Sequence, residues 1–338
     1  MRALSLLFSL LALCWAPVVT AQELPALGAN RAKVSVSGLS SGGFMAVQYS
    51  VAWSSEVMGV GVVAGGLYNC GSVFRAAGAI PFCMQQAWSA ASSWQAATGF
   101  ARDAVIDPAA NIARQRVYLF GGARDGVVVP AVMRSVFDFY TLAKVPKPAL
   151  RYVDTLPASH AFVSATVGGP CEETAASYVV QCQDHGRPYD QPYAILNHIY
   201  RLRAGPAAIL SAAPVPFDQR LYNSRRAMLA DTGYVFVPQA CRGPRGGCAV
   251  HVVFHGCVQS ADSLGSDLIY AQLGYNRWAD SNRIIMLYPQ VNKSSILAGN
   301  PLGCWDWWGY SEPFGFQLRH GLQIDSVRRM VARLLERP

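Results

Sequence analysis

Charge is scarce in this chain. Of its 338 residues only 14% are Asp, Glu, Lys or Arg, whereas 52% are hydrophobic. Such a composition is far from that of a disordered chain and is sufficient for a large core. Basic residues outnumber acidic ones by 28 to 20, but they are dispersed and form no stripe interleaved with aromatic residues. The sequence therefore argues against a nucleic-acid partner.

Long apolar runs are missing beyond the start of the chain, so we expect no membrane-spanning helix and no membrane partner. The start itself has one basic residue, Arg2, an apolar run over residues 4–15, and small residues leading to Ala21. This is the pattern of a secretory signal peptide. We expect residues 1–21 to be removed by cleavage near Ala21 and the protein to be secreted, either extracellular or periplasmic. A lipoprotein box ending at Cys14 fits less well, because Leu13 is bulky.

Cysteine patterns typical of metal sites are absent as well. No C-x-x-C pair occurs and the histidines are scattered, so we expect no metal. Cleavage of the leader leaves eight cysteines, and an even number in an exported chain implies disulfides. Three short-range couples stand out and leave a fourth pair, which gives Cys70–Cys83, Cys171–Cys182, Cys241–Cys248 and Cys257–Cys304.

No linker or internal repeat interrupts residues 22–338, so we expect a single domain. Apolar segments with strand character occur at residues 34–37, 58–63, 117–120, 150–153, 234–237, 250–254 and 284–288. Helical patterns occur at residues 44–52, 109–116, 131–144, 268–282 and 324–335. Short buried strands that alternate with helices predict an α/β fold whose sheet is mostly parallel and flanked by helices.

A nucleophile elbow is indicated by the sequence GLSSG at residues 38–42, which has the G-x-S-x-G form. In this motif the serine occupies a strained turn between a strand and a helix, and small neighbours let the two elements pack closely. The flanking segments have the required strand and helix patterns. Ser40 is therefore the predicted nucleophile of a serine hydrolase, unusually close to the start of the mature chain.

A serine nucleophile needs a general base, and the base needs an acid that fixes its orientation. His160 is the best candidate base, because it follows a strand-like segment and a turn, where catalytic groups of α/β sheets collect. The other histidines fit less well. His198 lies in a helical pattern, His251 lies inside a strand, and His185 and His320 lie in loops with no strand before them.

The predicted acid is Asp125, because the strand at residues 117–120 runs into a glycine turn that delivers it. Ser40, Asp125 and His160 then have the chain order of α/β hydrolases. An ordinary Asp-Gly turn is the alternative for Asp125. We expect Asp107 and Asp154 to be solvated surface residues.

An oxyanion hole needs one backbone N–H directly after the nucleophile and a second from a His-Gly loop at the end of another strand. Ser41 and Cys257 occupy these positions, since residues 255–257 read His-Gly-Cys after the strand at 250–254. This strand usually precedes the serine, but here it follows. A circular permutation that moves the usual first strands to the carboxyl end explains both the early serine and the late loop.

An aromatic segment, CWDWWGY at residues 304–310, would be tied to the oxyanion loop by the Cys257–Cys304 disulfide. A buried tryptophan cluster is the plain alternative. The interspersed acid, glycine and tyrosine favour the wall of a site for an apolar substrate. Together with the permuted order of the motifs, this segment resembles the extracellular poly(3-hydroxybutyrate) depolymerases of the single-domain, circularly permuted α/β-hydrolase type.

The resemblance implies a role for each motif residue: Ser40 as nucleophile, His160 as base, Asp125 as its orienting acid, the Ser41 and Cys257 amides as oxyanion donors, and Trp305, Trp307 and Trp308 as walls of the substrate crevice. It implies hydrolysis of the polyester or its oligomers through an acyl-enzyme, a reaction that needs no metal or organic cofactor. We expect the protein to be a monomer. We expect no separate substrate-binding domain, because only a helix-sized tail follows the aromatic segment.

Three other functions use some of the same residues. A secreted esterase for feruloyl, acetyl or lipid esters would need the same serine, acid and histidine. A peptidase fits less well but could use them too. A non-enzymatic polymer-binding protein would need the tryptophans but not Ser40.

Overall fold

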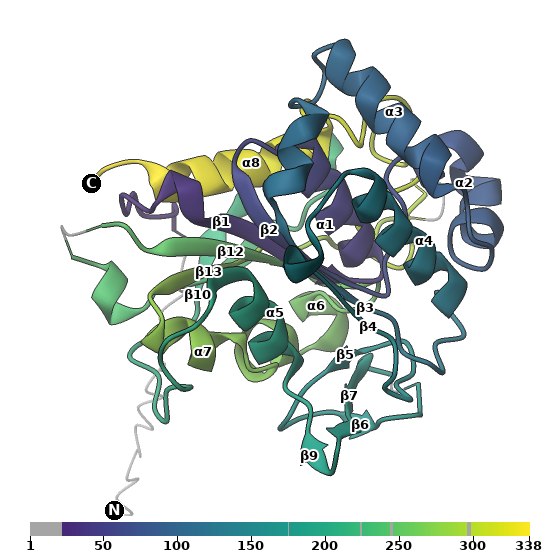
Figure 1. Cartoon of the computed structure of the whole chain (residues 1–338). Coiled ribbons are helices and arrows are strands. Elements are labelled where there is room, and N and C mark those ends of the chain that lie inside the picture. Colours follow the sequence, from purple (N-terminus) through teal and green to yellow (C-terminus); the bar gives the residue numbers. More distant parts are fainter. Residues whose placement is uncertain (1–21, 175, 224, 244–245, 296–298) are drawn as a thin grey trace, which may run out of the picture.

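The computed structural model describes residues 22–338 apart from 175, 224, 244–245 and 296–298, so the expected signal peptide lies outside the described residues. An eight-stranded sheet with helices on both faces forms the centre of the molecule (Figure 1). Its strands are β1 (Val34–Leu39), β2 (Val57–Val63), β3 (Arg116–Phe120), β4 (Leu150–Val153), β10 (Val215–Asp218), β11 (Thr232–Phe236), β12 (Ala249–Phe254) and β13 (Ile284–Tyr288).

The strand order is β10-β11-β13-β12-β1-β2-β3-β4. All neighbours from β13 to β4 are parallel, whereas β10 and β11 pair in antiparallel fashion at one edge. The central strands β1 and β12 are buried along their whole length. Strands that are buried on both faces are typical of a parallel sheet covered by helices on each side. The predicted fold class, with its mostly parallel sheet, is confirmed.

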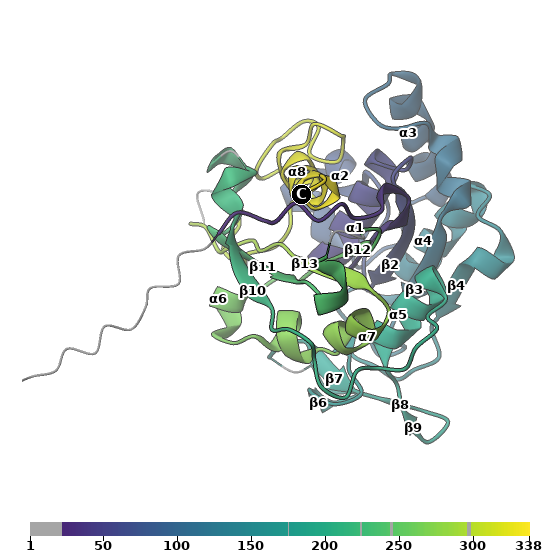
Figure 2. The same cartoon turned by 90° about the vertical axis from the view of Figure 1, so that its left-hand side faces the viewer.

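Helices cover both faces of the sheet, as Figures 1 and 2 show from two directions. One face carries α1 (Ser41–Ala52), α3 (Ala90–Arg102), α4 (Pro130–Leu142) and α8 (Leu322–Leu335). The other carries α5 (Gln191–Tyr200) and α7 (Tyr275–Ser281). The remaining helices are α2 (Cys70–Cys83) and the short α6 (Ala261–Leu264). None of the described helices is long and apolar enough to cross a bilayer.

The circular permutation is visible in how the chain enters and leaves the sheet. Strand β12, late in the sequence, pairs directly with β1, and Gly38 lies opposite Phe254. Helix α8 ends beside the segment that enters β1 (Figure 1), where the Gly28 N–H donates to the Glu336 carbonyl at 2.6 Å. Joining these two neighbouring ends would give a continuous path from α8 into the elbow strand, as the permutation requires.

A buried polar cluster joins β1 to β12 on the face that α5 and α7 cover. The two nitrogens of His251 lie 2.6 Å and 2.8 Å from the hydroxyls of Ser35 and Ser37. These hydroxyls in turn contact Tyr200 of α5 and Tyr275 of α7. Burial lowers the pKa of His251 to about 3, so the ring is neutral at physiological pH.

The structure differs from the predicted elements in two segments. The expected helix at residues 109–116 is a 3₁₀ turn (Ala109–Arg114), because Arg116 already belongs to β3. The expected helix at 268–282 is split into a π turn (Leu268–Gln272) and α7. Gly274, with φ of 118°, separates the two parts and cannot continue a helix in that conformation.

Two small sheets follow β4 and were not expected from the sequence. One contains β5 (Phe162–Val163), β6 (Gly169–Pro170) and β7 (Val179–Gln181), and the other contains β8 (Gln183–Asp184) and β9 (Arg187–Pro188). The four disulfides have the expected pairing: Cys70–Cys83, Cys171–Cys182, Cys241–Cys248 and Cys257–Cys304.

Candidate active site

Ser40 stands at the turn between β1 and α1. Its φ of 55° and ψ of −122° lie outside the regions that suit an L-residue, as expected for a nucleophile elbow. Close packing explains the glycines around it. A Cβ on Gly42 would lie 2.3 Å from the carbonyl oxygen of Phe254. A Cβ on Gly38 would lie 2.3 Å from the carbonyl oxygen of Gly42. The motif therefore brings the first turn of α1 against the end of β12.

Asp125 and His160 lie on the loops that follow β3 and β4. The carboxylate Oδ2 of Asp125 accepts a hydrogen bond from His160 Nδ1 at 2.9 Å. Its Oδ1 accepts the backbone N–H groups of Val127 and Val128 at 2.8 and 2.9 Å. An ionised carboxylate can only accept hydrogen bonds, so the histidine proton resides on Nδ1. Nε2 is then left as the acceptor.

The two loops pack backbone to backbone. A Cβ on Gly122 would lie 2.1 Å from the carbonyl oxygen of Ala158, and the Arg124 N–H donates to that same oxygen at 3.2 Å. Both the Asp125 and His160 side chains are almost fully buried. The pair is therefore held rigidly, with the imidazole beside the crevice that Ser40 also lines.

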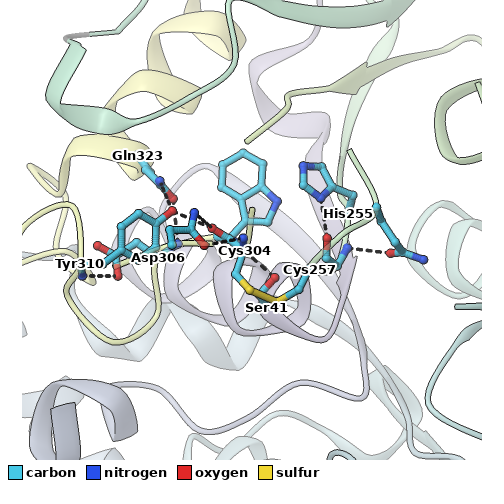
Figure 3. The surroundings of a disulfide bond; sticks show 11 residues. Ser41, His255, Cys257, Cys304, Asp306, Tyr310 and Gln323 are labelled. Carbon is cyan, nitrogen blue, oxygen red and sulfur yellow. Dashed lines mark hydrogen bonds between the residues drawn. A yellow bond between two sulfur atoms is a disulfide. The ribbon is translucent and has the colours of Figure 1, made fainter. Parts of the chain in front are cut away.

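The backbone amides of Ser41 and Cys257 lie at the same end of the sheet. Ser41 begins α1, and Cys257 follows β12 after two residues. Figure 3 shows Ser41 beside the Cys257–Cys304 disulfide. Within the part of the chain that the structure describes, the Cys257 N–H donates no hydrogen bond to another protein group. Both residues line the crevice that Ser40 and His160 also line.

His255 fixes the peptide plane that carries the Cys257 N–H. Its Nδ1 lies 2.6 Å from the Gly256 carbonyl oxygen, and its Nε2 accepts the Val291 N–H at 3.0 Å. These partners assign the proton to Nδ1. Burial lowers the pKa of His255 to about 4, which keeps the ring neutral. Because a peptide unit is planar, holding the Gly256 carbonyl also directs the Cys257 N–H.

A crevice of about 450 Å³ opens over these groups. Its walls are mostly apolar and include Leu39, Phe44, Met84, Val127, Leu302, Trp307 and Trp308. Trp307 stacks on Phe44 with a ring-centre distance of 4.2 Å, and Trp308 packs edge-on against Trp307. Among the described residues, no Asp, Glu, Lys or Arg lines the crevice.

The expectation that Trp305 lines the crevice is wrong. Its side chain is 0% exposed and packs edge-on against Phe254, at a ring-centre distance of 4.9 Å. Its backbone N–H donates to the hydroxyl oxygen of Ser41. Trp305 thus belongs to the core beneath the oxyanion loop, whereas Trp307 and Trp308 lie in the crevice wall.

Asp306 organises the loop that carries these tryptophans. Its Oδ1 accepts the N–H groups of Trp308, Gly309 and Tyr310, and its Oδ2 accepts both the N–H and the hydroxyl of Ser311. Burial raises the pKa of this carboxyl, while the five hydrogen bonds favour its charged form. Figure 3 shows Asp306 between Tyr310 and the disulfide. The carboxylate holds the loop in one conformation.

The remaining histidines and acids lie away from this group. His198, in α5, contacts the Ala149 carbonyl, and His185 is exposed. His320 follows the aromatic loop, outside the crevice wall.

Asp154 is exposed as expected. The expectation for Asp107 is wrong, because it is 5% exposed, caps the Ser55 N–H at 2.9 Å and pairs with Arg319 at 3.2 Å. No cluster of possible metal ligands occurs among the described residues.

Sequence reasoning missed several residues that shape the site. Tyr178 packs edge-on against the His160 ring at 5.9 Å, and Gln259 contacts the oxyanion loop. Neither belongs to a recognisable motif. Asp306 carries a weak signal, since an aspartate followed by glycine and serine is typical of turns in which side chains bind the backbone.

Comparisons with known proteins agree with this architecture. No protein-family model matches the chain. A poly(3-hydroxybutyrate) depolymerase of Delftia acidovorans is 39% identical over 96% of this chain, which spans 64% of the length of that enzyme. A polyhydroxybutyrate depolymerase of Talaromyces funiculosus is 35% identical over 86% of each chain.

Two solved structures are similar over most of their length. One is a PHB depolymerase of Penicillium funiculosum, and the other is a serine-to-alanine variant of a PHB depolymerase complexed with an R3HB trimer. Each has a TM-score of 0.82 and 31% identity, and the similarity covers 93% of this chain and 99% of the other. Both the sequence and the fold place this chain in the poly(3-hydroxybutyrate) depolymerase family.

Proposed function

We propose that this protein is a serine esterase that hydrolyses poly(3-hydroxybutyrate) and its oligomers through an acyl-enzyme. The observation that carries the proposal is that the strained Ser40 and the imidazole of the buried Asp125–His160 pair line the same apolar crevice. Family membership and the relative that holds an R3HB trimer support the substrate class.

In the proposed reaction His160 Nε2 takes the proton of Ser40 as Oγ attacks the ester carbonyl carbon. The Ser41 and Cys257 N–H groups stabilise the resulting oxyanion, each worth about 3 kcal/mol of the barrier. His160 then protonates the departing alcohol oxygen, and the ester C–O bond breaks. A water molecule, deprotonated by His160, attacks the acyl-enzyme and releases a hydroxyacid or a short oligomer. Asp125 stabilises the imidazolium in both steps. The steps need no metal or organic cofactor.

The walls of the crevice suit a neutral aliphatic polyester. The described lining has no charged side chain besides the potential charge of His160, so a chain of ester and methylene groups would enter without leaving a buried charge unpaired. Trp307 and Trp308 offer flat apolar surfaces to such a chain.

Large apolar residues are exposed on the two chain segments that supply Ile80 and Leu302 to the crevice and on the segment after the aromatic loop, and we propose that they contact the polymer surface. Val73, Ile80 and Phe82 come from α2, and Leu302 and Phe314 come from the segments that flank the aromatic loop, with exposures between 41% and 75%. Ile80 and Leu302 also line the crevice. We expect residues 22–338 to adsorb and hydrolyse as one catalytic domain and as a monomer, after export and cleavage near Ala21.

Initial rates on a poly(3-hydroxybutyrate) film, feruloyl and acetyl esters, long-chain triglyceride and casein test the substrate class. The film should be hydrolysed fastest. Ser40→Ala should lower kcat by a factor of about 10⁵ to 10⁶ while folding and film adsorption persist. A protein that binds the film but is not labelled by a fluorophosphonate would instead be a non-enzymatic binder.

A further inference from the structure

Gln259 lies next to the oxyanion loop and is 1% exposed. Its Oε1 accepts the Gly256 N–H at 2.7 Å. Its Nε2 donates to the carbonyl oxygens of Ser177 at 2.7 Å and Tyr178 at 3.1 Å. One amide side chain therefore connects the loop after β12 with the segment that leads into β7, which is distant in the sequence. All three of these side-chain hydrogen bonds are made to backbone groups.

The backbone on both sides of this connection is strained. Val258, directly before Gln259, has φ of 55°, and Tyr178 has φ of 51°. A positive φ is unfavourable for a β-branched or an aromatic residue, at a cost of about 1–3 kcal/mol, and persists only where surrounding contacts enforce it. Strain of this kind gathers at functional sites. Gln259 contacts the Tyr178 carbonyl directly, and it is the chain neighbour of Val258, whose N–H donates to the Leu302 carbonyl at 2.7 Å.

The two ends of this connection reach the oxyanion amide and the proposed base. At one end Gln259 accepts the Gly256 N–H while His255 holds the Gly256 carbonyl, and the two contacts together direct the Cys257 N–H. At the other end the Tyr178 carbonyl also accepts the N–H of Phe162, two residues after His160, at 3.0 Å.

The Tyr178 ring packs edge-on against the imidazole of His160. The same segment that receives Gln259 thus supports the base through both its backbone and its side chain.

We propose that Gln259 is a positioning residue that holds the oxyanion amide of Cys257 and the imidazole of His160 in a fixed relation to each other. The proposal rests on the proposed esterase function. It predicts a loss in turnover rather than in substrate binding, because both groups act on the transition state.

The first test compares Gln259→Leu with Gln219→Leu, using p-nitrophenyl butyrate as the substrate. Gln219 is a matched control, since it is buried and makes the same set of contacts, one accepted from the Gln290 N–H and two donated to the Ala230 and Gln290 carbonyls. None of these partners lines the crevice.

Both variants should lose similar thermal stability. Gln259→Leu should lower kcat by about 10- to 100-fold with KM changed less than about twofold, because a misplaced group costs up to roughly 10² in rate. An equal kcat in the two folded variants would overturn the proposal.

A second variant keeps the test decisive if Gln259→Leu does not fold. In Gln259→Glu one carboxyl oxygen can still accept the Gly256 N–H, but the other faces the two carbonyl oxygens and can donate only when protonated. Activity relative to the unmodified protein, measured at the same pH, should rise several-fold between pH 8.5 and pH 5.5. A ratio that does not change with pH would contradict the proposal.

Because p-nitrophenyl butyrate is soluble, the test of Gln259 does not depend on which polymer the protein hydrolyses. The proposed function fails separately: it would be refuted if the unmodified protein hydrolysed no ester, or if Ser40→Ala kept full activity.

Discussion

Gly42→Ala tests the close contact that brings the two proposed oxyanion amides together. The added Cβ would lie 2.3 Å from the Phe254 carbonyl oxygen and 2.4 Å from that of His255. Non-bonded atoms settle at about 3.5 Å. Both obstacles are rigid backbone, so α1 and the end of β12 must separate by about 1 Å. One of these elements carries the Ser41 N–H, and the other leads to the Cys257 N–H.

This separation should widen the oxyanion hole. A misplacement of about 1 Å lowers rates by about 10²-fold, and removal of one oxyanion donor lowers kcat by about 10²- to 10³-fold. We therefore expect kcat for p-nitrophenyl butyrate to fall about 100-fold, which corresponds to about 2.7 kcal/mol in the barrier. Overpacking should also lower the free energy of unfolding by about 1–3 kcal/mol.

Two glycine variants serve as controls in the same assay. Gly205→Ala adds a Cβ with no atom within 4 Å and should change neither activity nor stability. Gly43→Ala lies in the same turn of α1, but its Cβ would approach Val63 and Gly65 at 2.9 Å, at the end of β2 and not at the end of β12. It should lose stability and keep kcat within about tenfold. A folded Gly42→Ala protein with unchanged kcat would refute the reasoning.

Three further variants test other parts of the site. Asp125→Asn should lower kcat about 10⁴-fold at pH 7 with the fold intact, because the asparagine no longer fixes the tautomer of His160; a loss below tenfold would contradict this. Asp306→Asn should lower the free energy of unfolding in urea by about 3 kcal/mol, because one amide oxygen cannot satisfy all five donors, and an unchanged urea midpoint would contradict it. His251 has a pKa of about 3 in the folded protein, below its unfolded value of about 6.5, so its contribution to stability is complete above pH 6.5 and is lost as the pH falls toward 3. In His251→Gln the decrease in unfolding free energy between pH 7 and pH 4.5 should be smaller than in the unmodified protein, and an equal decrease would exclude the histidine as its source.

The central sheet could be predicted from sequence because its strands are short, apolar and separated by helical patterns. The segments at 58–63, 117–120 and 284–288 fall within β2, β3 and β13. The order of the motifs also indicated the permutation, since a His-Gly-Cys loop far downstream can serve Ser40 only if β12 and β1 are neighbours. The small sheets after β4 were missed because strands of two or three residues leave no periodic pattern.

The site was predictable to the extent that it depends on motifs. The structure places Ser40 and His160 in the wall of one crevice and Asp125 in hydrogen-bond contact with His160, and the catalytic roles of all three stay predictions. Trp305 could not be distinguished from Trp307 by sequence, because which side chain of a loop points inward depends on tertiary packing. Gln259 and Tyr178 meet only after folding across 81 positions of the chain, and hydrogen bonds from a side chain to backbone carbonyls leave no local signature.

The most direct measurement for the central claim is mass analysis of the soluble products released from purified poly(3-hydroxybutyrate), by the unmodified protein and by Ser40→Ala in parallel. The unmodified protein should release 3-hydroxybutyrate and its short oligomers, and the Ser40→Ala protein should release none above background. Equal release by both proteins, or no release by either, would contradict the assignment.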